Sequence, residues 1–189
     1  MPKPIRLVIF GRQGAGKGTQ CAKLVEHYGV AHISTGDMLR AAIAAGTEMG
    51  LKAKTVMDAG NLVSDEIILG IVRERLTEED VQNDGFVLDG FPRTTAQAEG
   101  LVQILGEDEL HAVVDLDVPV EEVTVRMKAR GRDDDTDEGI ARRLELYEQE
   151  TRPVLDWFSD RGLLLTVSGL GEEADITTRL ISAISDATD

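Results

Sequence analysis

Five short runs of apolar residues recur along the 189-residue chain, and longer segments with helical spacing separate them. A run of this kind, bounded by polar or glycine residues, is typical of a buried strand. Strands that alternate with helices favour βαβ units, with helices on both faces of a parallel sheet and ligands at the carboxyl ends of the strands. We therefore predict an α/β fold, a three-layer sandwich around a five-stranded parallel sheet. The predicted strands are Ile5–Phe10, Val30–Ser34, Gly85–Asp89, Ala112–Val118 and Leu163–Ser168.

Two segments interrupt this alternation. Residues 34–63 belong to a stretch with several helical patterns between the second and third predicted strands, which is too long for one crossover, and we expect a small subdomain there. Residues 130–139 (RGRDDDTDEG) lie between two predicted helices. This segment is too polar to pack and too short to fold alone, so we interpret it as a mobile flap. The alternative is a plain solvated loop.

The most informative motif is GRQGAGKGT, residues 11–19, which directly follows the first predicted strand. Its glycines let backbone N–H groups point at an anion, and the helix that begins near Lys17 adds the partial positive charge of its N-terminus. Lys17 can reach β- and γ-phosphates, and Thr19 offers a hydroxyl to phosphate or Mg²⁺. The spacing fits the Walker A pattern, although Gly18 stands where Ser or Thr is usual. The alternative is a glycine turn with a surface lysine, but strand, loop and helix signals coincide and favour a nucleotide-phosphate site.

The composition narrows the compartment and the partners. The formal net charge is −15, which argues against a nucleic acid polymer as a partner and makes the few arginines informative. Cys21 is the single cysteine, so no intrachain disulfide or cysteine zinc cluster is possible, and we expect it to be a buried small residue. The N-terminus lacks a long apolar signal core, and no run approaches the roughly 20 apolar residues of a membrane span. We therefore expect a cytoplasmic protein without a membrane contact.

Polar residues follow the third predicted strand in the motif FVLDGFPR. Asp89 ends the strand. In a chain with a Walker A loop, a carboxylate at this place usually helps to hold Mg²⁺, often through water. Its alternative role is a helix cap. Arg93 lies near the same edge of the sheet, and Gln97 comes one helical turn later, so we expect the two side chains to share a helix face.

The motif STGDMLR follows the second predicted strand. Thr35 and Asp37 can cap the helix that comes next, and this role is compatible with ligand binding. Arg40 lies one turn into that helix, from where it can reach an anion.

Further arginines gather around the predicted flap. Arg126 and Arg130 are four residues apart on one predicted helix and face the same way. Arg132 is inside the flap, and Arg143 is on the helix that follows. Each alone reads as a solvated charge. Together, in an acidic chain that must hold several phosphates, they favour phosphate binding, for which the planar guanidinium suits bidentate contacts.

Several motifs taken together resemble those of a known family. GRQGAGKGT, STGDMLR, MDAGNLVSDE, LDGFPRTTAQAE and RRLELYEQETRPV, in this order, resemble the adenylate kinase family from residue 5 to about residue 185. The resemblance implies a single P-loop kinase core over residues 1–189, with an AMP-binding insertion at 34–63 and a short lid at 129–139. It implies the reaction MgATP + AMP ⇌ MgADP + ADP in a monomer, with ATP, AMP and ADP as ligands, Mg²⁺ as cofactor and no zinc.

The resemblance also assigns functional residues. On the ATP side they are Gly14, Ala15, Gly16, Lys17, Gly18, Thr19, Arg126 and Gly171. On the AMP side they are Thr35, Arg40, Asn61, Leu62, Val63, Gly90, Phe91, Pro92, Arg93, Gln97, Arg132 and Arg143. The catalytic set is Lys17, Arg93, Arg130, Arg132 and Arg143, while Asp37 and Asp89 match carboxylates near the waters of Mg²⁺.

One departure from the family pattern concerns loop rigidity. The family commonly has proline where this chain has Gln13. Proline restricts φ and stiffens a loop before binding, so Gln13 loosens that restraint and puts loop rigidity and ATP affinity in question.

Two other functions compete with this interpretation. A UMP/CMP kinase is the nearer one, but that sister group tends to carry Ala and Asn where this chain has Thr35 and Gln97. A regulatory NTP-binding switch would need a guanine-reading motif such as Asn-Lys-x-Asp, which this chain lacks. His27, His32 and His111 fall outside the motifs, and the proposed reaction needs no general base because the attacking phosphate oxygen is already ionised.

Overall fold

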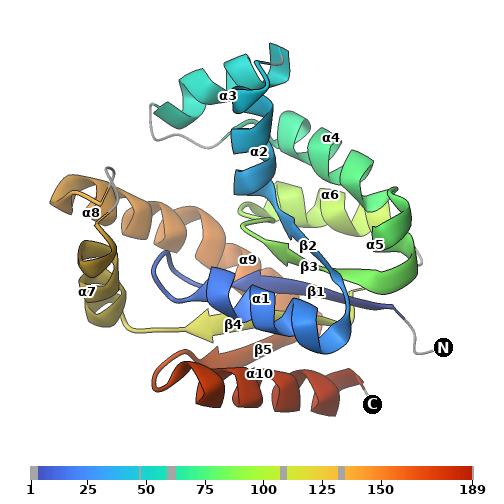
Figure 1. Cartoon of the computed structure of the whole chain (residues 1–189), viewed down its shortest axis with the longest axis vertical. Coiled ribbons are helices and arrows are strands. Elements are labelled where there is room, and N and C mark those ends of the chain that lie inside the picture. Colours follow the sequence, from blue (N-terminus) through green and yellow to red (C-terminus); the bar gives the residue numbers. More distant parts are fainter. Residues whose placement is uncertain (1–3, 47, 59–62, 107–109, 132–134, 189) are drawn as a thin grey trace.

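The computed structural model describes residues 4–46, 48–58, 63–106, 110–131 and 135–188. Within these residues, five parallel strands form one sheet in the order β2-β3-β1-β4-β5 (Figure 1). The strands are β1 (Ile5–Phe10), β2 (Ala31–Ser34), β3 (Gly85–Asp89), β4 (Ala112–Asp117) and β5 (Leu164–Ser168). The predicted fold class is confirmed. The bounds of β1 and β3 match the prediction, and the other strands differ by one residue at one end.

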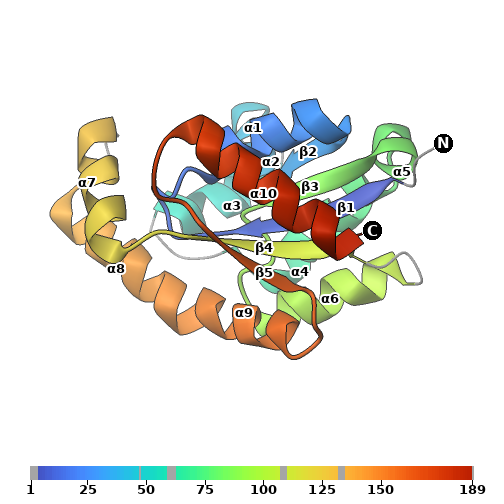
Figure 2. The same cartoon turned by 90° about the horizontal axis from the view of Figure 1, so that it is seen from below.

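Helices cover both faces of the sheet (Figures 1 and 2). The face with α1 (Lys17–Tyr28) and α10 (Glu173–Thr188) carries one hydrophobic cluster, which α7 (Val120–Arg130) joins. The opposite face carries the other cluster, beneath the four remaining core helices. These are α4 (Asp65–Leu76), α5 (Glu79–Asp84), α6 (Thr95–Leu105) and α9 (Arg152–Ser159).

The central strand β1 shows why the strands read as continuous apolar runs. Leu7 and Ile9 belong to the cluster under α1 and α10, whereas Val8 and Phe10 belong to the cluster under α6 and α9. Because side chains alternate between two buried faces, the buried positions Leu7 to Phe10 are all apolar, and the polar Arg6 lies near the start of the strand, where burial is partial. Because β1 is the central strand, its carboxyl end lies in the middle of the sheet, between the ends of β3 and β4.

Two parts of the chain extend beyond the core at this end of the sheet. The helices α2 (Thr35–Ala44) and α3 (Glu48–Asp58) form the first, which occupies most of the predicted insertion. The second contains α7 and α8 (Asp137–Leu146). Helix α8 continues through a π-helical turn, η1 (Tyr147–Thr151), directly into α9. Figure 1 shows these two parts on different sides of the P-loop, which is the glycine-rich segment of residues 11–19 where β1 leads into α1. No helix in the described ranges has the length and apolar character that a membrane span requires.

Candidate active site

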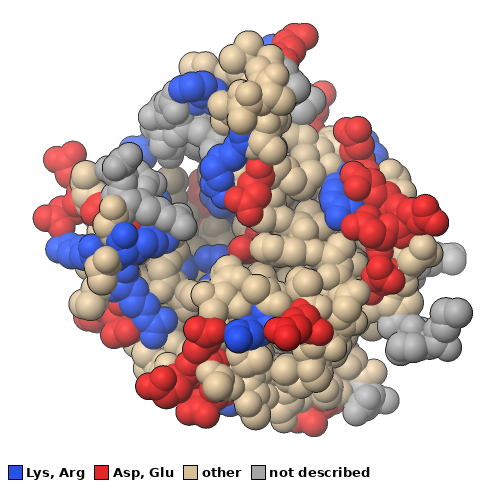
Figure 3. All heavy atoms as spheres, viewed as in Figure 1, with Lys and Arg blue, Asp and Glu red and all other residues tan. Residues whose placement is uncertain are grey.

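A cleft of about 770 Å³ lies at the carboxyl ends of the strands. It is lined by the P-loop, the start of α2, the loop after β3 and residues of α7, α8 and η1. Figure 3 shows Lys and Arg side chains gathered around this hollow, although the protein as a whole is acidic. The predicted site residues that line it are Gly14, Gly16, Lys17, Gly18, Thr19, Thr35, Asp37, Arg40, Val63, Asp89, Gly90, Phe91, Pro92, Arg93, Gln97, Arg126, Arg130 and Arg143.

Two predicted residues do not line the cleft. Ala15 is buried in the core, and only its carbonyl oxygen takes part in the site, as an acceptor from Arg126 Nη1 at 3.3 Å. Gly171 lies in the loop after β5, beyond the cleft lining. The predictions for Asn61, Leu62 and Arg132 fall outside the described residues.

The P-loop packs tightly against α7. Gly14 has a φ of +85°, and a Cβ atom there would come within 2.9 Å of Met127 Cγ. A glycine is therefore required both for the backbone conformation and for the close approach. The Ala15 N–H donates to the Arg12 carbonyl oxygen at 3.0 Å and closes the turn, and α1 begins at Lys17.

Lys17 projects back over this loop. Its Nζ donates to the carbonyl oxygens of Gly11 at 2.8 Å and Arg12 at 3.3 Å. Burial lowers the pKa of Lys17, while the nearby Asp89 carboxylate opposes that shift. Since both of these carbonyl groups are neutral, the ammonium charge is available to an anion in the cleft.

The start of α2 corrects one prediction. Ser34, and not Thr35 or Asp37, is the N-cap residue, and its hydroxyl accepts from the Asp37 N–H at 3.3 Å. The Thr35 hydroxyl instead donates to the Gly90 carbonyl oxygen at 3.2 Å and joins α2 to the loop after β3. Asp37 pairs with Arg40 on the exposed surface of α2. This hydrogen bond to Arg40 is the main reason that the pKa of Asp37 lies below its usual value.

The loop after β3 corrects a second prediction. Arg93 precedes α6, which begins at Thr95, so Arg93 and Gln97 do not share a helix face. They meet differently, because the Gln97 side-chain oxygen accepts from the Arg93 backbone N–H at 2.7 Å. Gln97 Nε2 donates to Asp65 at 2.8 Å, and Arg93 Nε donates to the Gly90 carbonyl oxygen at 2.9 Å. The Phe91–Pro92 peptide bond in this loop is cis. Gln97 is thus fixed at both ends of its amide.

Arg126 joins the P-loop to the end of the sheet. On α7 it pairs with Glu122 at 2.7 Å, and its Nη2 donates to the Gly169 carbonyl oxygen at 3.2 Å. Together with its contact to Ala15, these bonds hold the guanidinium beside the phosphate loop.

Arg130 and Arg143 converge on one carboxylate. Asp135 accepts two hydrogen bonds from Arg130, at 2.8 and 3.0 Å, and one from Arg143 at 3.1 Å. The Asp135 side chain is only 1% exposed. Within the described part of the predicted flap, the Asp135 side chain is therefore packed, whereas Gly131, Thr136, Asp137 and Glu138 are exposed. The closure of the flap stays a prediction. The predicted i, i+4 placement of Arg126 and Arg130 on one helix is confirmed.

Comparisons with known proteins identify the family of this chain. A sequence-family model described as adenylate kinase matches residues 9–163. The chain belongs to the adenylate kinase family. A protein named adenylate kinase from Stenotrophomonas maltophilia (strain K279a) is 53% identical over 187 residues, covering 95% of this chain and 99% of its own length. Proteins of the same name from Leptospira biflexa serovar Patoc and Xanthomonas campestris pv. campestris are 48% and 47% identical over 185 and 186 residues, with the same shares of each chain covered.

Two carboxylates in the cleft could hold a magnesium ion. Asp89 and Asp37 both line it, and carboxylate oxygens are the ligand type that Mg²⁺ prefers, often through retained waters. Beside Asp89 lie His32, 3.8 Å away, and the buried Cys21. Burial, followed by the Asp89 charge, raises the pKa of the Cys21 thiol far above its usual value, so this group remains protonated at neutral pH. The set therefore suits a hard oxygen-seeking cation better than one that requires a thiolate.

Several residues of the adenylate kinase cleft were missed by the sequence reasoning. His32 and Tyr147 line the cleft, and Asp65 anchors Gln97. Asp135 pairs with the flap arginines. Asp65 lies within the motif MDAGNLVSDE at a helix start, and Tyr147 lies within RRLELYEQETRPV, so these motifs were the available signals. Nothing local marks His32 as a neighbour of the P-loop.

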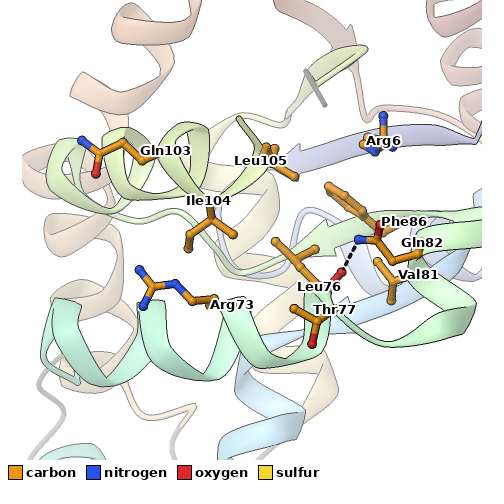
Figure 4. A pocket seen from close by; sticks show the side chains of 10 residues that line it. All are labelled: Arg6, Arg73, Leu76, Thr77, Val81, Gln82, Phe86, Gln103, Ile104 and Leu105. Carbon is orange, nitrogen blue, oxygen red and sulfur yellow. Dashed lines mark hydrogen bonds between the residues drawn. The ribbon is translucent and has the colours of Figure 1, made fainter. Parts of the chain in front are cut away.

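A second cavity, of about 450 Å³, lies away from the cleft, between α4, α5, α6 and the beginnings of β1 and β3 (Figure 4). Figure 4 shows Arg73, Ile104 and Leu76 around this space, with Gln82 bonded to the Leu76 carbonyl oxygen at 2.6 Å. It contains none of the predicted site residues. The predicted site residues in the described part of the chain, apart from Ala15 and Gly171, thus meet in the larger cleft.

Proposed function

We propose that this chain catalyses reversible phosphoryl transfer from MgATP to AMP, giving two ADP. The observation that carries the proposal is the common cleft, in which the P-loop Lys17 faces both the Thr35–Gln97 side and the arginines of α7 and α8. A donor triphosphate on the P-loop and an acceptor monophosphate on the other side would then share these cations.

Catalysis in this site rests on positioning and on charge. The acceptor phosphate oxygen is ionised at neutral pH, so no side chain has to remove a proton. Lys17, at the start of α1, and Arg93, Arg130 and Arg143 would orient the phosphoryl groups and stabilise charge on the transferred group. When bound, Mg²⁺ would neutralise phosphate charge, and Asp89 and Asp37 would hold it through its waters.

Selectivity for AMP is assigned to the buried side chains Thr35 and Gln97. The Gln97 amide already accepts from Arg93 and donates to Asp65, which leaves one N–H and one lone pair for an adenine edge. Because its protein partners fix the amide, a base with a different edge would lose these hydrogen bonds.

The finer features of the proposal follow the family. We propose a cytoplasmic monomer whose ligands are ATP, AMP and ADP, without a nucleic acid polymer or a membrane as partner. The net charge of −15 supports the exclusion of nucleic acid, because a phosphate backbone requires a basic surface. The 34–63 insertion and the 129–139 lid remain part of this proposal.

A coupled assay of ADP formation tests the proposed function. The purified chain is given MgATP with AMP, UMP, CMP or no acceptor. We expect ADP formation that depends on AMP and is much slower with UMP or CMP. Equal rates with CMP would assign the chain to UMP/CMP kinases, and ADP release without any acceptor would favour an NTP hydrolase or switch.

A further inference from the structure

Arg12 is part of the P-loop, but its side chain does not line the cleft. It runs toward the π-helical turn η1 and is only 13% exposed. Its Nε and Nη2 atoms both donate to Glu148 Oε1, at 3.1 and 2.6 Å, and its guanidinium lies 5.5 Å from the centre of the Tyr147 ring. Nη1 donates to the Val118 carbonyl oxygen at 3.2 Å. A surface arginine that served only solubility would not make this many directed contacts.

The backbone of the same residue contacts Lys17. The Arg12 carbonyl oxygen accepts from Lys17 Nζ at 3.3 Å and from the Ala15 N–H at 3.0 Å. The position of this carbonyl therefore helps to set both the shape of the loop and the direction of the Lys17 ammonium. Because its partners hold the Arg12 side chain in place, they also fix the Arg12 carbonyl group and with it these two hydrogen bonds.

The far end of the Arg12 contact is itself connected to the phosphate site. Turn η1 follows α8, which carries Arg143, and the Thr151 hydroxyl at its end donates to the Arg93 carbonyl oxygen at 3.4 Å. π-helical turns inside helices are rare and are frequent at functional sites. One continuous helix thus contacts the P-loop through Arg12, the loop of Arg93 through Thr151, and the cleft through Arg143.

We propose that Arg12 is a positioning residue, which holds the P-loop in register with the α8–η1–α9 helix so that Lys17 and Arg143 meet the same phosphoryl group. This inference rests on the proposed function and assigns a role in it to a residue whose side chain does not line the cleft. It also offers a restraint on a loop that has Gln13 in place of a stiffening proline. The restraint comes from tertiary contacts 136 residues apart and not from the backbone of the loop itself.

The test compares Arg12→Met with Arg12→Lys and with a matched control, Arg161→Met. Arg161 also stacks on an aromatic ring, 3.3 Å from the Trp157 centroid, and donates to a backbone carbonyl oxygen at 2.8 Å, but it does not line the cleft. We expect Arg12→Met to lower kcat by about tenfold to hundredfold, because small misplacements of reacting groups cost rates of this order. KM for AMP should change by less than about twofold, since AMP contacts are untouched. Arg12→Lys, which keeps the charge but loses the fork, should fall between.

Two further measurements separate positioning from stability. In hydrogen exchange of the ligand-free proteins, Arg12→Met should raise exchange of the amides of residues 11–16, and Arg161→Met should not. In a double-mutant cycle, Arg12→Met with Glu148→Gln should be no slower than Arg12→Met alone, because the two residues act as a unit.

The proposal fails if Arg12→Met keeps the kcat of Arg161→Met and exchanges its loop amides as the wild-type chain does, whatever happens to its Tm. The wild-type chain is assayed alongside. An inactive wild-type chain would refute the proposed function, while the exchange arm would still decide whether Arg12 orders the loop.

Discussion

Lys17 and the arginine pair Arg130–Arg143 all line the proposed phosphate site, but the protein holds them in different ways. Lys17 Nζ donates to two neutral backbone carbonyl groups of its own loop. Arg130 and Arg143 instead donate to the buried carboxylate of Asp135. Carbonyl partners orient a cation without cancelling its charge, whereas a carboxylate partner competes with any phosphate that arrives.

The proposed site therefore has two halves. The preorganised half is the P-loop with Lys17, and the switchable half is the flap with Arg130 and Arg143. The carbonyl partners leave the charge of Lys17 in place, and the close packing of Gly14 on α7 holds the P-loop around it. Arg130 and Arg143 have a carboxylate partner in Asp135, so phosphates in the proposed site would have to share these arginines with Asp135 or replace it. A ligand can shift that equilibrium only by its difference in affinity for the two arrangements.

Removing the preorganised charge should have the largest effect. We expect Lys17→Ala to lower kcat by at least about 10²-fold, because a fixed charge beside developing phosphate charge is lost. Lys23→Ala is the matched control on the same helix, since Lys23 is exposed and pairs only weakly with Glu173 at 3.6 Å. The measurement is steady-state ADP formation, with circular dichroism to confirm folding. A folded Lys17→Ala protein with near-normal kcat would contradict the preorganised role.

The side chains proposed to bind the adenine base of AMP, Thr35 and Gln97, should behave like the preorganised half of the site. Gln97→Ala should raise KM for AMP about tenfold, as expected when a buried polar contact is lost, and should narrow the gap between AMP and CMP. KM for ATP should change much less. Gln103→Ala on the same helix is the control, because Gln103 lies away from the cleft. If ATP binding suffers instead of AMP binding, the base site has been assigned to the wrong nucleotide.

The metal-side acid should give a smaller effect. Asp89→Asn keeps the shape of the side chain but removes the charge that would hold the waters of Mg²⁺. We expect a several-fold rise in the Mg²⁺ concentration for half-maximal rate, measured at fixed ATP. Asp80→Asn, at an exposed Asp paired with Arg75 outside the cleft, is the control. An unchanged Mg²⁺ dependence would leave Asp89 with a structural role.

The switchable half should respond mainly in conformation. Fluorescent labels on Glu138→Cys in the flap and Asp186→Cys on α10, both exposed positions, would report the distance between flap and core. A two-substrate mimic should shorten that distance more than ATP alone, because it supplies charge at both subsites. Asp135→Asn replaces the competing carboxylate with a neutral amide, so ATP alone should close the flap further than in the wild-type chain. An identical distance with and without the mimic would reduce the flap to a static loop.

Much of the fold could be predicted from local patterns. The strands were predictable because two buried faces favour apolar residues at most positions, although Arg6 and Asp115 are exceptions. Glycine and aspartate mark the ends of Gly85–Asp89. The helix start at Lys17 followed from the glycine-rich loop before it. The misplacement of Arg93 arose because the Thr94 hydroxyl caps α6 and moves the helix start past Arg93.

The partners of the charged residues could not be predicted in the same way. The motifs indicated which residues face the cleft, but not what holds them. The Arg12–Glu148 contact joins residues 136 positions apart, and Gln97 and Asp65 are 32 apart. Asp135 was read as one more solvated acid, because a single sequence does not distinguish a charge that solubilises a loop from one that packs between two guanidinium groups.

The buried thiol one turn beyond Lys17 makes the molecule convenient to label. Cys21 is the single cysteine of the chain, its side chain is fully buried, and burial keeps its sulfur protonated. Maleimide reagents attack exposed thiolates, so they should ignore Cys21 while the protein is folded. Any cysteine introduced on the surface would then be modified alone, without first removing the native one. Conversely, modification of Cys21 would report opening of the core beneath the P-loop, a motion that turnover measurements do not detect.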